Sequence, residues 1–546
     1  MMASYAERVW AGLWAMHHKT KDAFTFFSRE KGDAPVQSPS GHSANQTVHD
    51  PRKKQGSGRT KWQNIGLLLG PLLFFAVLFG LSPEGMPKEA LAVLASTIWI
   101  AVWWITEAIP IPATSLLPIV LFPLAGAGAE GITSAYADDT IFLFLGGFIL
   151  AIAMEKWNLH KRIALNIILL VGTSTERIVL GFMIATGFLS MWTSNTATAM
   201  MMMPIGLAVI SHLKESALGQ NVEGNFGKAI MLGVAYSASI GGLGTLIGTP
   251  PNTIFAGVVK ELYGVQISFA GWMLFGVPLA AILLFAVWFY LVKMAFPIKL
   301  KEIPGGKGVI QNEKNQLGTM SSEEISVLIV FILTALAWVT RTFIPFEFMD
   351  RVNDTLIAIT GALALFILPS RRAREGKLLN WKDAKEIPWG ILLLFGGGLA
   401  IAKGFKESGL AKWIGEQLTL LESVHFLIVI LCVTALVLFL TEITSNTATA
   451  TMMFPIMASL SHALNVHPYA LMVAAGIAAS CAFMLPVATP PNAIAFGSGH
   501  IKIKDMAKAG FWINIFCIFF ISLLIYYYMP IAWGIDISVF PQELKQ

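Results

Sequence analysis

Long apolar segments alternate with short polar loops along most of the chain. Their lengths are near the roughly 20 residues that a helix needs to cross a bilayer, or longer. They run without the strict alternation of a membrane β-barrel, so helices are favoured. The pattern predicts an all-α polytopic membrane protein with about eleven transmembrane helices, at 62–81, 88–107, 109–126, 141–158, 229–262, 271–293, 324–344, 353–369, 388–403, 468–500 and 509–530.

Two further apolar stretches, 177–212 and 425–462, do not fit as simple spans. Each is too long for one crossing and too short for two crossings with a loop. Each carries a polar string in its middle, "TSNTATAMMMMPI" at 193–205 and "TSNTATATMMFPI" at 444–456, and the strings agree at 11 of 13 positions. Non-helical backbone at membrane depth is tolerated only where it is buried in protein or lines a cavity. We therefore predict two re-entrant hairpins with "TSNT" at their tips.

Paired prolines interrupt two of the spans. Pro250 and Pro251 lie within 229–262, and the same pair recurs at 490 and 491 within 468–500. Proline cannot continue a helix but suits the first turn of a new one. Each span therefore predicts two half-helices, with Thr249 or Thr489 as the N-cap, unpaired carbonyls before the threonine and free amides after it.

The paired features belong to a longer internal repeat. "FLGGFILAIA" (144–153) and "GTPPNTI" (248–254) flank the first string as "LFGGGLAIA" (394–402) and "ATPPNAI" (488–494) flank the second. Five predicted spans separate the two tips, and an odd number inverts the second copy relative to the first. Inverted repeats with broken helices are typical of secondary transporters. The predicted organisation is an arm at 1–61, a first helix within 62–87, repeats at 88–300 and 323–534, a loop at 301–322 and a tail at 535–546.

Composition and charge agree with this interpretation. Of 546 residues, 55% are hydrophobic and only 13% are charged, too few to cover a soluble protein of this length. The net charge of +5 lies in basic loops that predict a cytoplasmic N-terminus and an extracytoplasmic C-terminus, rather than a nucleic-acid partner. Residues 1–61 contain either an interfacial amphipathic helix followed by a linker or a poorly ordered arm. No His/Asp/Glu or Ser/His cluster lies at membrane depth, which argues against an enzyme.

The tips and the proline breaks offer oxygen ligands without positive side chains. Hydroxyl, amide and carbonyl oxygens favour a small hard cation, and helix N-termini favour a carboxylate. A dianion bound there would need bound cations to balance its charge, because an unpaired charge at membrane depth is expensive. The nearest carboxylates are Glu107 and Glu442, and we expect a structural role for Glu442. Trp103 and Trp104 are expected to form an interfacial belt.

The "SNT" tips, the "TPPN" breaks and "WWITEAIPIP" resemble the divalent anion/sodium symporter (DASS) family over about residues 62–534. The resemblance implies a homodimeric elevator-type transporter in a bacterial inner membrane, with Na⁺ as coupling ion. It implies a first sodium site of Ser190, Ser194, Asn195 and the Gly248 carbonyl, and a second of Thr441, Ser445, Asn446 and the Ala488 carbonyl. The implied substrate residues are Asn195, Thr196, Asn446, Thr447, Thr249, Pro250, Thr489 and Pro490.

The expected function is sodium-coupled import of C4-dicarboxylates such as succinate, malate or fumarate. The alternatives within the family are a sodium-independent dicarboxylate exchanger and a sodium-coupled citrate or sulfate transporter. An exchanger would be expected to place fixed positive charge where the cations bind, and this sequence has none there. An anion channel would need a continuous pore, which two hairpins entering from opposite faces do not favour.

Overall fold

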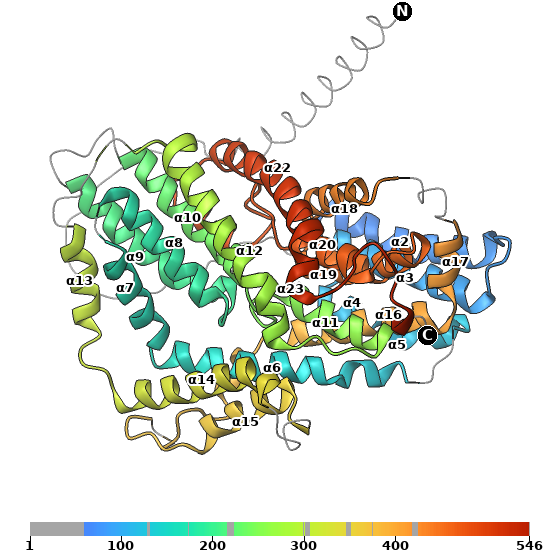
Figure 1. The fold of residues 1–546 in the computed structure, drawn as a ribbon, viewed down its shortest axis with the longest axis horizontal. Helices are drawn as coiled ribbons and strands as arrows, with labels where there is room; N and C mark the ends of the chain where they lie inside the picture. Colours follow the sequence, from blue (N-terminus) through green and yellow to red (C-terminus); the bar gives the residue numbers. More distant parts are fainter. Residues whose placement is uncertain are drawn as a thin grey trace, which may run out of the picture. The chain divides into compact units, whose positions relative to one another are not determined.

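The structure is a computed structural model that describes residues 59–544, except 128–130, 173, 216–222, 299, 301–305, 345–350, 374 and 418–423. Helices make up most of the described chain (Figure 1). The predicted amphipathic helix and linker at 1–58 lie outside the described residues. The chain is all-helical over its described part, as the sequence pattern predicted.

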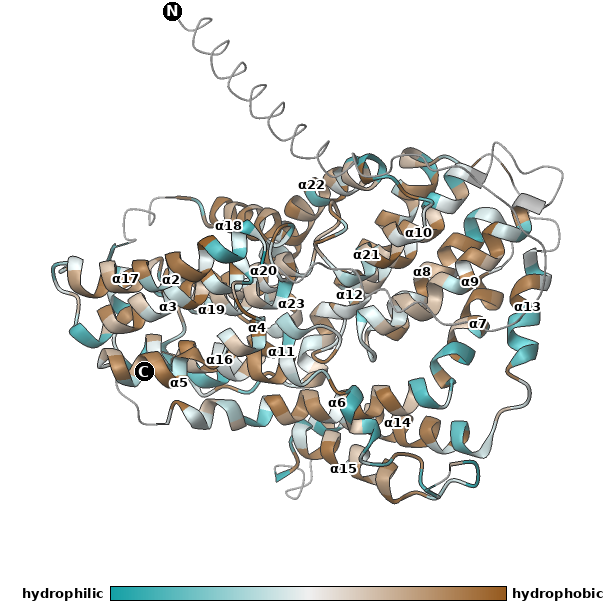
Figure 2. Ribbon diagram, turned by 180° about the vertical axis from the view of Figure 1, so that it is seen from behind, coloured by the Kyte–Doolittle hydropathy of each residue, from teal (hydrophilic) through white to brown (hydrophobic). Residues whose placement is uncertain are grey.

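Within the described residues, eight helical segments are long and apolar enough to cross a membrane, and Figure 2 shows their predominantly hydrophobic residues. They include six of the eleven predicted spans with boundaries close to those expected. These are α2 (Lys61–Gly80), α3 (Lys88–Thr106), α6 (Asp139–Lys156), α12 (Phe269–Phe289, continued by the π-helix η3, Tyr290–Ala295), α14 (Ser322–Thr340) and α16 (Trp389–Glu407). A seventh predicted span is α22 (Ile503–Tyr527), followed by the short α23 (Met529–Trp533), and an eighth is the shorter α15 (Asp354–Ile367).

The predicted continuous span at 109–126 is wrong. Helix α4 (Ile111–Thr114) ends after one turn, and α5 (Leu117–Ala125) begins three residues later. The Ser115 hydroxyl donates to the Ile111 carbonyl at 2.8 Å, and Pro118 lies in the first turn of α5. Proline is favoured at a helix start and disfavoured inside a helix, so the new helix starts here.

Three helices occur where the sequence pattern indicated only loops. Helix α7 (Leu159–Val171) follows α6, α13 (Gly306–Gln316) lies in the predicted cytoplasmic loop, and α17 (Leu410–Gln417) follows α16. All three are shorter than a span and amphipathic. They escaped prediction because the search relied on long apolar runs.

Both predicted hairpins are pairs of helices joined by a short turn. The first consists of α8 (Thr175–Ser190) and α9 (Asn195–Glu215), and the second of α18 (Phe426–Thr441) and α19 (Asn446–Ala463). Helix α9 extends beyond residue 212 and is itself long enough to span a bilayer. The outgoing arm of the first hairpin is therefore longer than the half-helix predicted.

Both predicted broken helices are broken at the proline pairs. Helix α10 (Glu223–Gly242) stops eight residues before α11 (Pro250–Tyr263), and α20 (Pro468–Ala479) stops eleven residues before α21 (Pro490–Gly497). Helices α10 and α20 are largely buried, since every described residue of α10 from 226 onwards is at most partly exposed and every residue of α20 is buried. Helix α10 packs against α8, α9 and α21, and α20 packs against α18 and α19. The arrangement brings elements of both repeats together at the centre.

Candidate substrate and cation site

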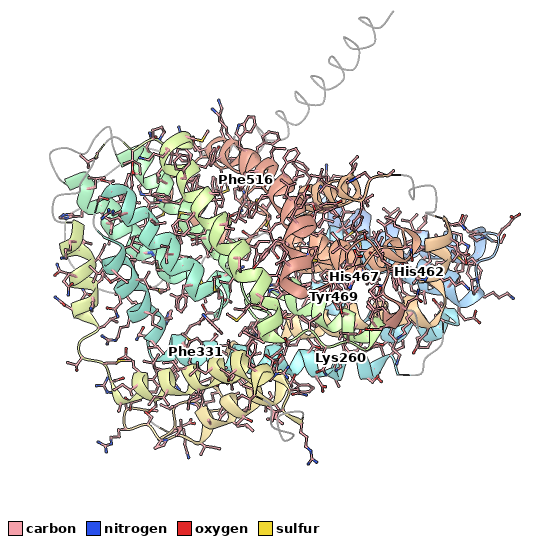
Figure 3. All side chains as sticks on the ribbon, viewed as in Figure 1. Lys260, Phe331, His462, His467, Tyr469 and Phe516 are labelled. Atoms are coloured by element: carbon pink, nitrogen blue, oxygen red, sulfur yellow. The ribbon has the colours of Figure 1, made fainter. Side chains whose placement is uncertain are left out.

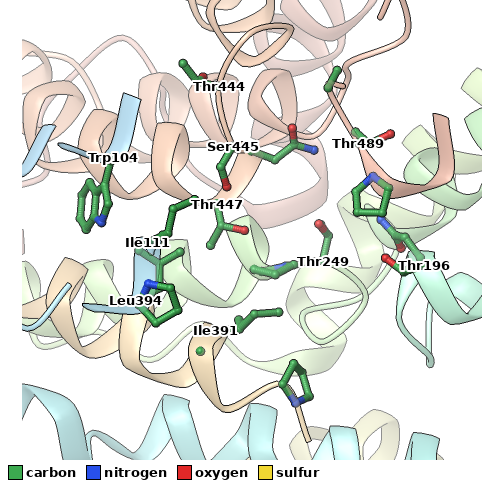
Figure 4. Close-up of a pocket in the computed structure, with 18 of the residues that line it drawn as sticks. Trp104, Ile111, Thr196, Thr249, Ile391, Leu394, Thr444, Ser445, Thr447 and Thr489 are labelled. Carbon is green, nitrogen blue, oxygen red and sulfur yellow. The ribbon is translucent and has the colours of Figure 1, made fainter. Parts of the chain in front are cut away.

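The tips of both hairpins and the breaks of both split helices line one cavity of about 740 Å³. In Figure 4, Thr196 of α9, Thr447 of α19, Thr249 and Thr489 surround the same space. The predicted residues that line the cavity are Ser194, Asn195, Thr196, Gly248, Thr249, Pro250, Ser445, Asn446, Thr447, Ala488, Thr489 and Pro490. The structure thus gathers twelve of the predicted site residues, from sequence segments about 250 residues apart, around one volume.

The other two predicted residues, Ser190 and Thr441, lie directly behind the tips. The Ser190 hydroxyl contacts Asn195 Oδ1 at 2.5 Å and the Ala238 carbonyl at 2.6 Å. The Thr441 hydroxyl makes the matching contacts, at 2.8 Å to Asn446 Oδ1 and 2.8 Å to the Ala479 carbonyl. Each hydroxyl therefore fixes the amide oxygen of its asparagine and ties the hairpin to the broken helix.

The first tip meets the first break in close contact at Gly242. A Cβ atom on Gly242 would lie 2.9 Å from Asn195 Oδ1 and 3.0 Å from the Gly248 carbonyl oxygen. The Asn195 amide oxygen and the Gly248 carbonyl oxygen therefore lie beside Gly242, and the Ser190 hydroxyl contacts that amide oxygen. This donor set suits a small hard cation.

The second tip repeats this geometry with one difference. Asn446 and Ala488 line the cavity as Asn195 and Gly248 do, but Ala482 occupies the position that corresponds to Gly242. Gly242 has no Cβ atom, whereas Ala482 carries one at the matching position of the second copy. The two candidate cation sites are therefore related but not identical.

Two buried asparagines hold the chain between the half-helices, and the sequence analysis assigned them no role. Asn252 Nδ2 donates to the carbonyls of Gly242 at 3.0 Å and Thr245 at 2.7 Å. Asn492 Nδ2 donates to the carbonyls of Ala482 at 3.0 Å and Leu485 at 3.1 Å. The repeated "TPPN" string was the available signal, because its asparagine recurs with the prolines.

The expected capping at the breaks is only partly correct. Thr249 occupies the N-cap position of α11 without a side-chain capping bond, whereas the Thr489 hydroxyl accepts from the Asn492 amide at 3.4 Å. The prediction of free amides after the threonine is wrong for both α11 and α21. The first two residues of each helix are prolines without N–H groups, the Asn252 amide donates to the Thr249 carbonyl, and the Asn492 amide donates to the Thr489 hydroxyl. An anion would interact there with the helix dipole, and with free amides at the starts of α9 and α19.

Much of the remaining cavity wall is apolar, and α3, α6 and α16 contribute to it. Phe144, Phe148 and Leu394 belong to the two glycine-containing strings recognised as repeated, although no cavity role was predicted for them. Trp104 also lines the cavity, is 2% exposed and donates through Nε1 to the Ser115 hydroxyl at 3.2 Å. The interfacial-belt prediction is therefore wrong for Trp104.

Electrostatically, the cavity lacks fixed positive charge. Among the described residues that line it there is no Lys, Arg or His, and the only ionisable side chain is Glu107. Nowhere in the described ranges do three His, Cys, Asp or Glu residues gather closely enough to hold a metal ion. Any cation bound here would depend on hydroxyl, amide and carbonyl oxygens.

Glu442 has the structural role that the sequence analysis expected. Its carboxylate is 3% exposed and accepts from the backbone amides of Phe483, Met484 and Leu485 at 2.8–3.2 Å. It also accepts from Asn514 Nδ2 at 2.7 Å. The carboxylate fixes the irregular chain after α20, which forms the break of the second repeat.

We expect Glu442→Gln to destabilise the protein. A glutamine amide would present N–H groups to backbone N–H groups, and each buried donor left unpaired costs roughly 1–3 kcal/mol. Thermal unfolding in detergent should show a lower midpoint for this variant than for Glu375→Gln, which alters an exposed pair with Lys382. Equal midpoints for the two variants would contradict the structural role.

A family model described as the sodium:sulfate symporter transmembrane region matches residues 61–534. A sodium-dependent dicarboxylate transporter, SdcS, of Staphylococcus saprophyticus is 52% identical over 500 residues, covering 90% of this chain and 96% of the relative. The SdcS protein of Staphylococcus aureus is 54% identical over 490 residues, covering 88% of this chain and 94% of the relative. The region that the family model matches spans both hairpins, both breaks and every residue of the cavity wall except Thr60.

Solved structures agree at the level of the fold. Neisseria gonorrhoeae MtrF has a TM-score of 0.55 at 12% identity, covering 87% of this chain and 96% of that one. The Alcanivorax borkumensis YdaH transporter has a TM-score of 0.53 at 14% identity, covering 74% and 88%. Together with the family match, these comparisons show that this chain is an integral membrane protein of the sodium:sulfate symporter family, the family that its paired "SNT" and "TPPN" strings resemble.

Proposed function

We propose that this protein is a sodium-coupled symporter of C4-dicarboxylates such as succinate, malate or fumarate. The observation that carries the proposal is the convergence of two copies of one oxygen-rich element on a single cavity that has no fixed positive charge. The names of the SdcS relatives, which are more than half identical in sequence, support the choice of dicarboxylate and sodium.

The charge balance explains how the cavity would hold its substrate. A dicarboxylate in this cavity would meet free amides and hydroxyls at the starts of α9 and α19, and the dipoles of α11 and α21. These partial charges do not neutralise a dianion, and Glu107 adds negative charge to the wall. Cations bound by the Ser190–Asn195–Gly248 and Thr441–Asn446–Ala488 sets would supply the missing charge, so substrate and sodium would bind together.

The transport cycle follows from the repeats. We propose that the two copies are inverted, and that hairpins and broken helices move together against the remaining helices as an elevator within a homodimer. The N-terminus would lie in the bacterial cytoplasm and the C-terminus outside the inner membrane. No chemical conversion of the substrate is proposed, because the described residues that line the cavity include no nucleophile–base pair.

Uptake into proteoliposomes tests the coupling. With an inward sodium gradient and empty vesicles, radiolabelled succinate should accumulate, and it should not accumulate when potassium or choline replaces sodium. The physical reason is that the dianion would enter an uncompensated, low-dielectric cavity without the cations. Sodium-independent uptake that requires succinate inside the vesicles would instead establish an exchanger. Inhibition by excess citrate or sulfate would reveal the alternative substrates of the family.

A further inference from the structure

A second large cavity lies away from the transport site. Its volume is about 660 Å³, and it is enclosed by the N-terminal part of α10, the C-terminal end of α12 with η3, and the first turns of α22. The loops that adjoin these helix ends, "KMAFPIKLKEIPGGKG" and "HIKIKDMAK", are the basic loops predicted to be cytoplasmic. The cavity therefore lies at the expected level of the cytoplasmic headgroups.

The charges in this cavity do not cancel. Lys228 pairs with Asp505 at 3.0 Å and lies 5.6 Å above the ring of Phe296. Asp505 also accepts from the Lys502 amide at the start of α22. Lys508 is exposed and makes no hydrogen bond or ion pair with any residue in the described ranges. Because Asp505 is already paired, the Lys508 ammonium is a surplus positive charge in the cavity.

The charged part of the cavity continues into an apolar, aromatic surface. One turn beyond Lys508, Trp512 is 55% exposed, and Met294 on the facing helix is 66% exposed. Further along α22, Phe516 and Phe519 are also exposed, and Figure 3 shows Phe516 on this helix. Along α22 the exposed residues thus change from the basic Lys508 to Trp512 and then to the apolar Phe516 and Phe519. A bilayer changes in the same direction from headgroup to acyl chain.

We propose that this cavity binds the headgroup of an anionic phospholipid from the cytoplasmic leaflet. Lys508 would contact the phosphate, Lys228 and the Asn225 amide would lie at its sides, and the acyl chains would follow Trp512 and Met294. Basic pockets between transmembrane helices on the cytoplasmic side are typical sites for anionic lipids. Three helices of the repeats, α10, α12 and α22, would then be held together by one lipid.

Native mass spectrometry of the detergent-purified protein tests the assignment. Phosphatidylglycerol should give a bound-lipid peak that phosphatidylcholine does not match at equal concentration. Lys508→Gln should reduce phosphatidylglycerol occupancy roughly fivefold, since one basic residue near an anionic surface contributes about 1 kcal/mol. Lys508→Arg should retain the binding, and Lys412→Gln, which removes an exposed lysine of α17, should not change it.

Each other outcome overturns the proposal. Equal phosphatidylglycerol binding by wild type and Lys508→Gln would place the lipid elsewhere. Equal binding of phosphatidylcholine would remove the role of charge. Full competition by glycerol 1-phosphate at the lipid's own concentration would indicate a soluble phosphate site rather than a lipid site. A Lys508→Gln protein of altered oligomeric mass would indicate that the cavity is a subunit contact.

Discussion

Alanine in place of Asn195 will reduce sodium-dependent succinate uptake to the background of protein-free liposomes, a loss of roughly 100-fold. Asn195 lines the transport cavity, and its Oδ1 lies beside the Gly248 carbonyl oxygen while accepting from Ser190. The substitution removes one proposed cation ligand and one proposed substrate contact at the same position. Outer-shell changes alone cost about 10- to 100-fold in metal affinity, so the loss of a direct ligand belongs at the upper end.

The fold should survive this change. Ser190 keeps its hydrogen bond to the Ala238 carbonyl, so no buried hydroxyl is left unpaired. The measurements are the initial rate of uptake and the rise in melting temperature on adding sodium, and both responses should disappear. Asn446→Ala should behave in the same way, whereas Asn315→Ala, on α13 outside the cavity, should match wild type. Wild-type uptake by Asn195→Ala would refute the site assignment.

The grouping of the candidate site residues around one cavity could be predicted from sequence because the two copies of the site resemble each other. Membrane depth excludes water, so a polar string within an apolar stretch must be buried in protein or line a cavity. Its repetition at 193–205 and 444–456, each beside a proline pair, identified the four elements that now line one cavity. The breaks were predictable from the paired prolines, because two adjacent residues without amide N–H groups disfavour a continuous helix. Single prolines lie inside α2, α9, α12 and α19 without ending them.

The rest of the site depends on contacts that no local pattern reports. Trp104 appeared to be a membrane-interface residue, yet the fold places it in the cavity wall with its indole N–H bonded to Ser115. Thr249 makes no side-chain capping bond. The sequence could not show this, because it does not define the orientation of the hydroxyl. Asn252 Nδ2 donates hydrogen bonds to the carbonyls of Thr245 and Gly242, which are seven and ten residues earlier in the chain. These carbonyls come within reach only because α10 has already ended at Gly242.

The fold, like the site, could be predicted from the sequence only in part. Long apolar helices were predicted within a few residues, because length and hydropathy alone decide whether a helix can cross a bilayer. The amphipathic helices α7, α13 and α17 were missed, because their stability comes from packing one face against neighbours rather than from an apolar run. The α4–α5 break also lacked a decisive signal, since Pro118 is compatible with both a kink and a new helix.

The two candidate cation sites differ at one position, which is Gly242 in the first copy and Ala482 in the second. This difference leads to the other prediction with a large expected effect. Gly242→Ala will raise the sodium concentration needed for half-maximal uptake by roughly tenfold or more, within the range expected when the supporting shell of a metal site is disturbed. The added methyl carbon would lie 2.9 Å from Asn195 Oδ1 and 3.0 Å from the Gly248 carbonyl oxygen. The backbone carbonyl cannot easily move, so the Asn195 side chain must turn away from its place in the first candidate cation site.

Gly244→Ala is the matched control, because it makes the same substitution two residues along the same segment. Its methyl carbon would approach only the side chain of Met191, with 2.9 Å to Cε, and that flexible side chain can move. Ala482→Gly tests the second copy, where the corresponding position already carries a methyl group, and it should leave sodium activation unchanged.

Sodium titration of uptake distinguishes these variants at equal protein content. If Gly242→Ala and Gly244→Ala required the same sodium concentration as wild type, the first cation site could not lie beside Gly242. Loss of sodium activation only in Gly242→Ala would place a coupling cation between the first hairpin tip and the first helix break.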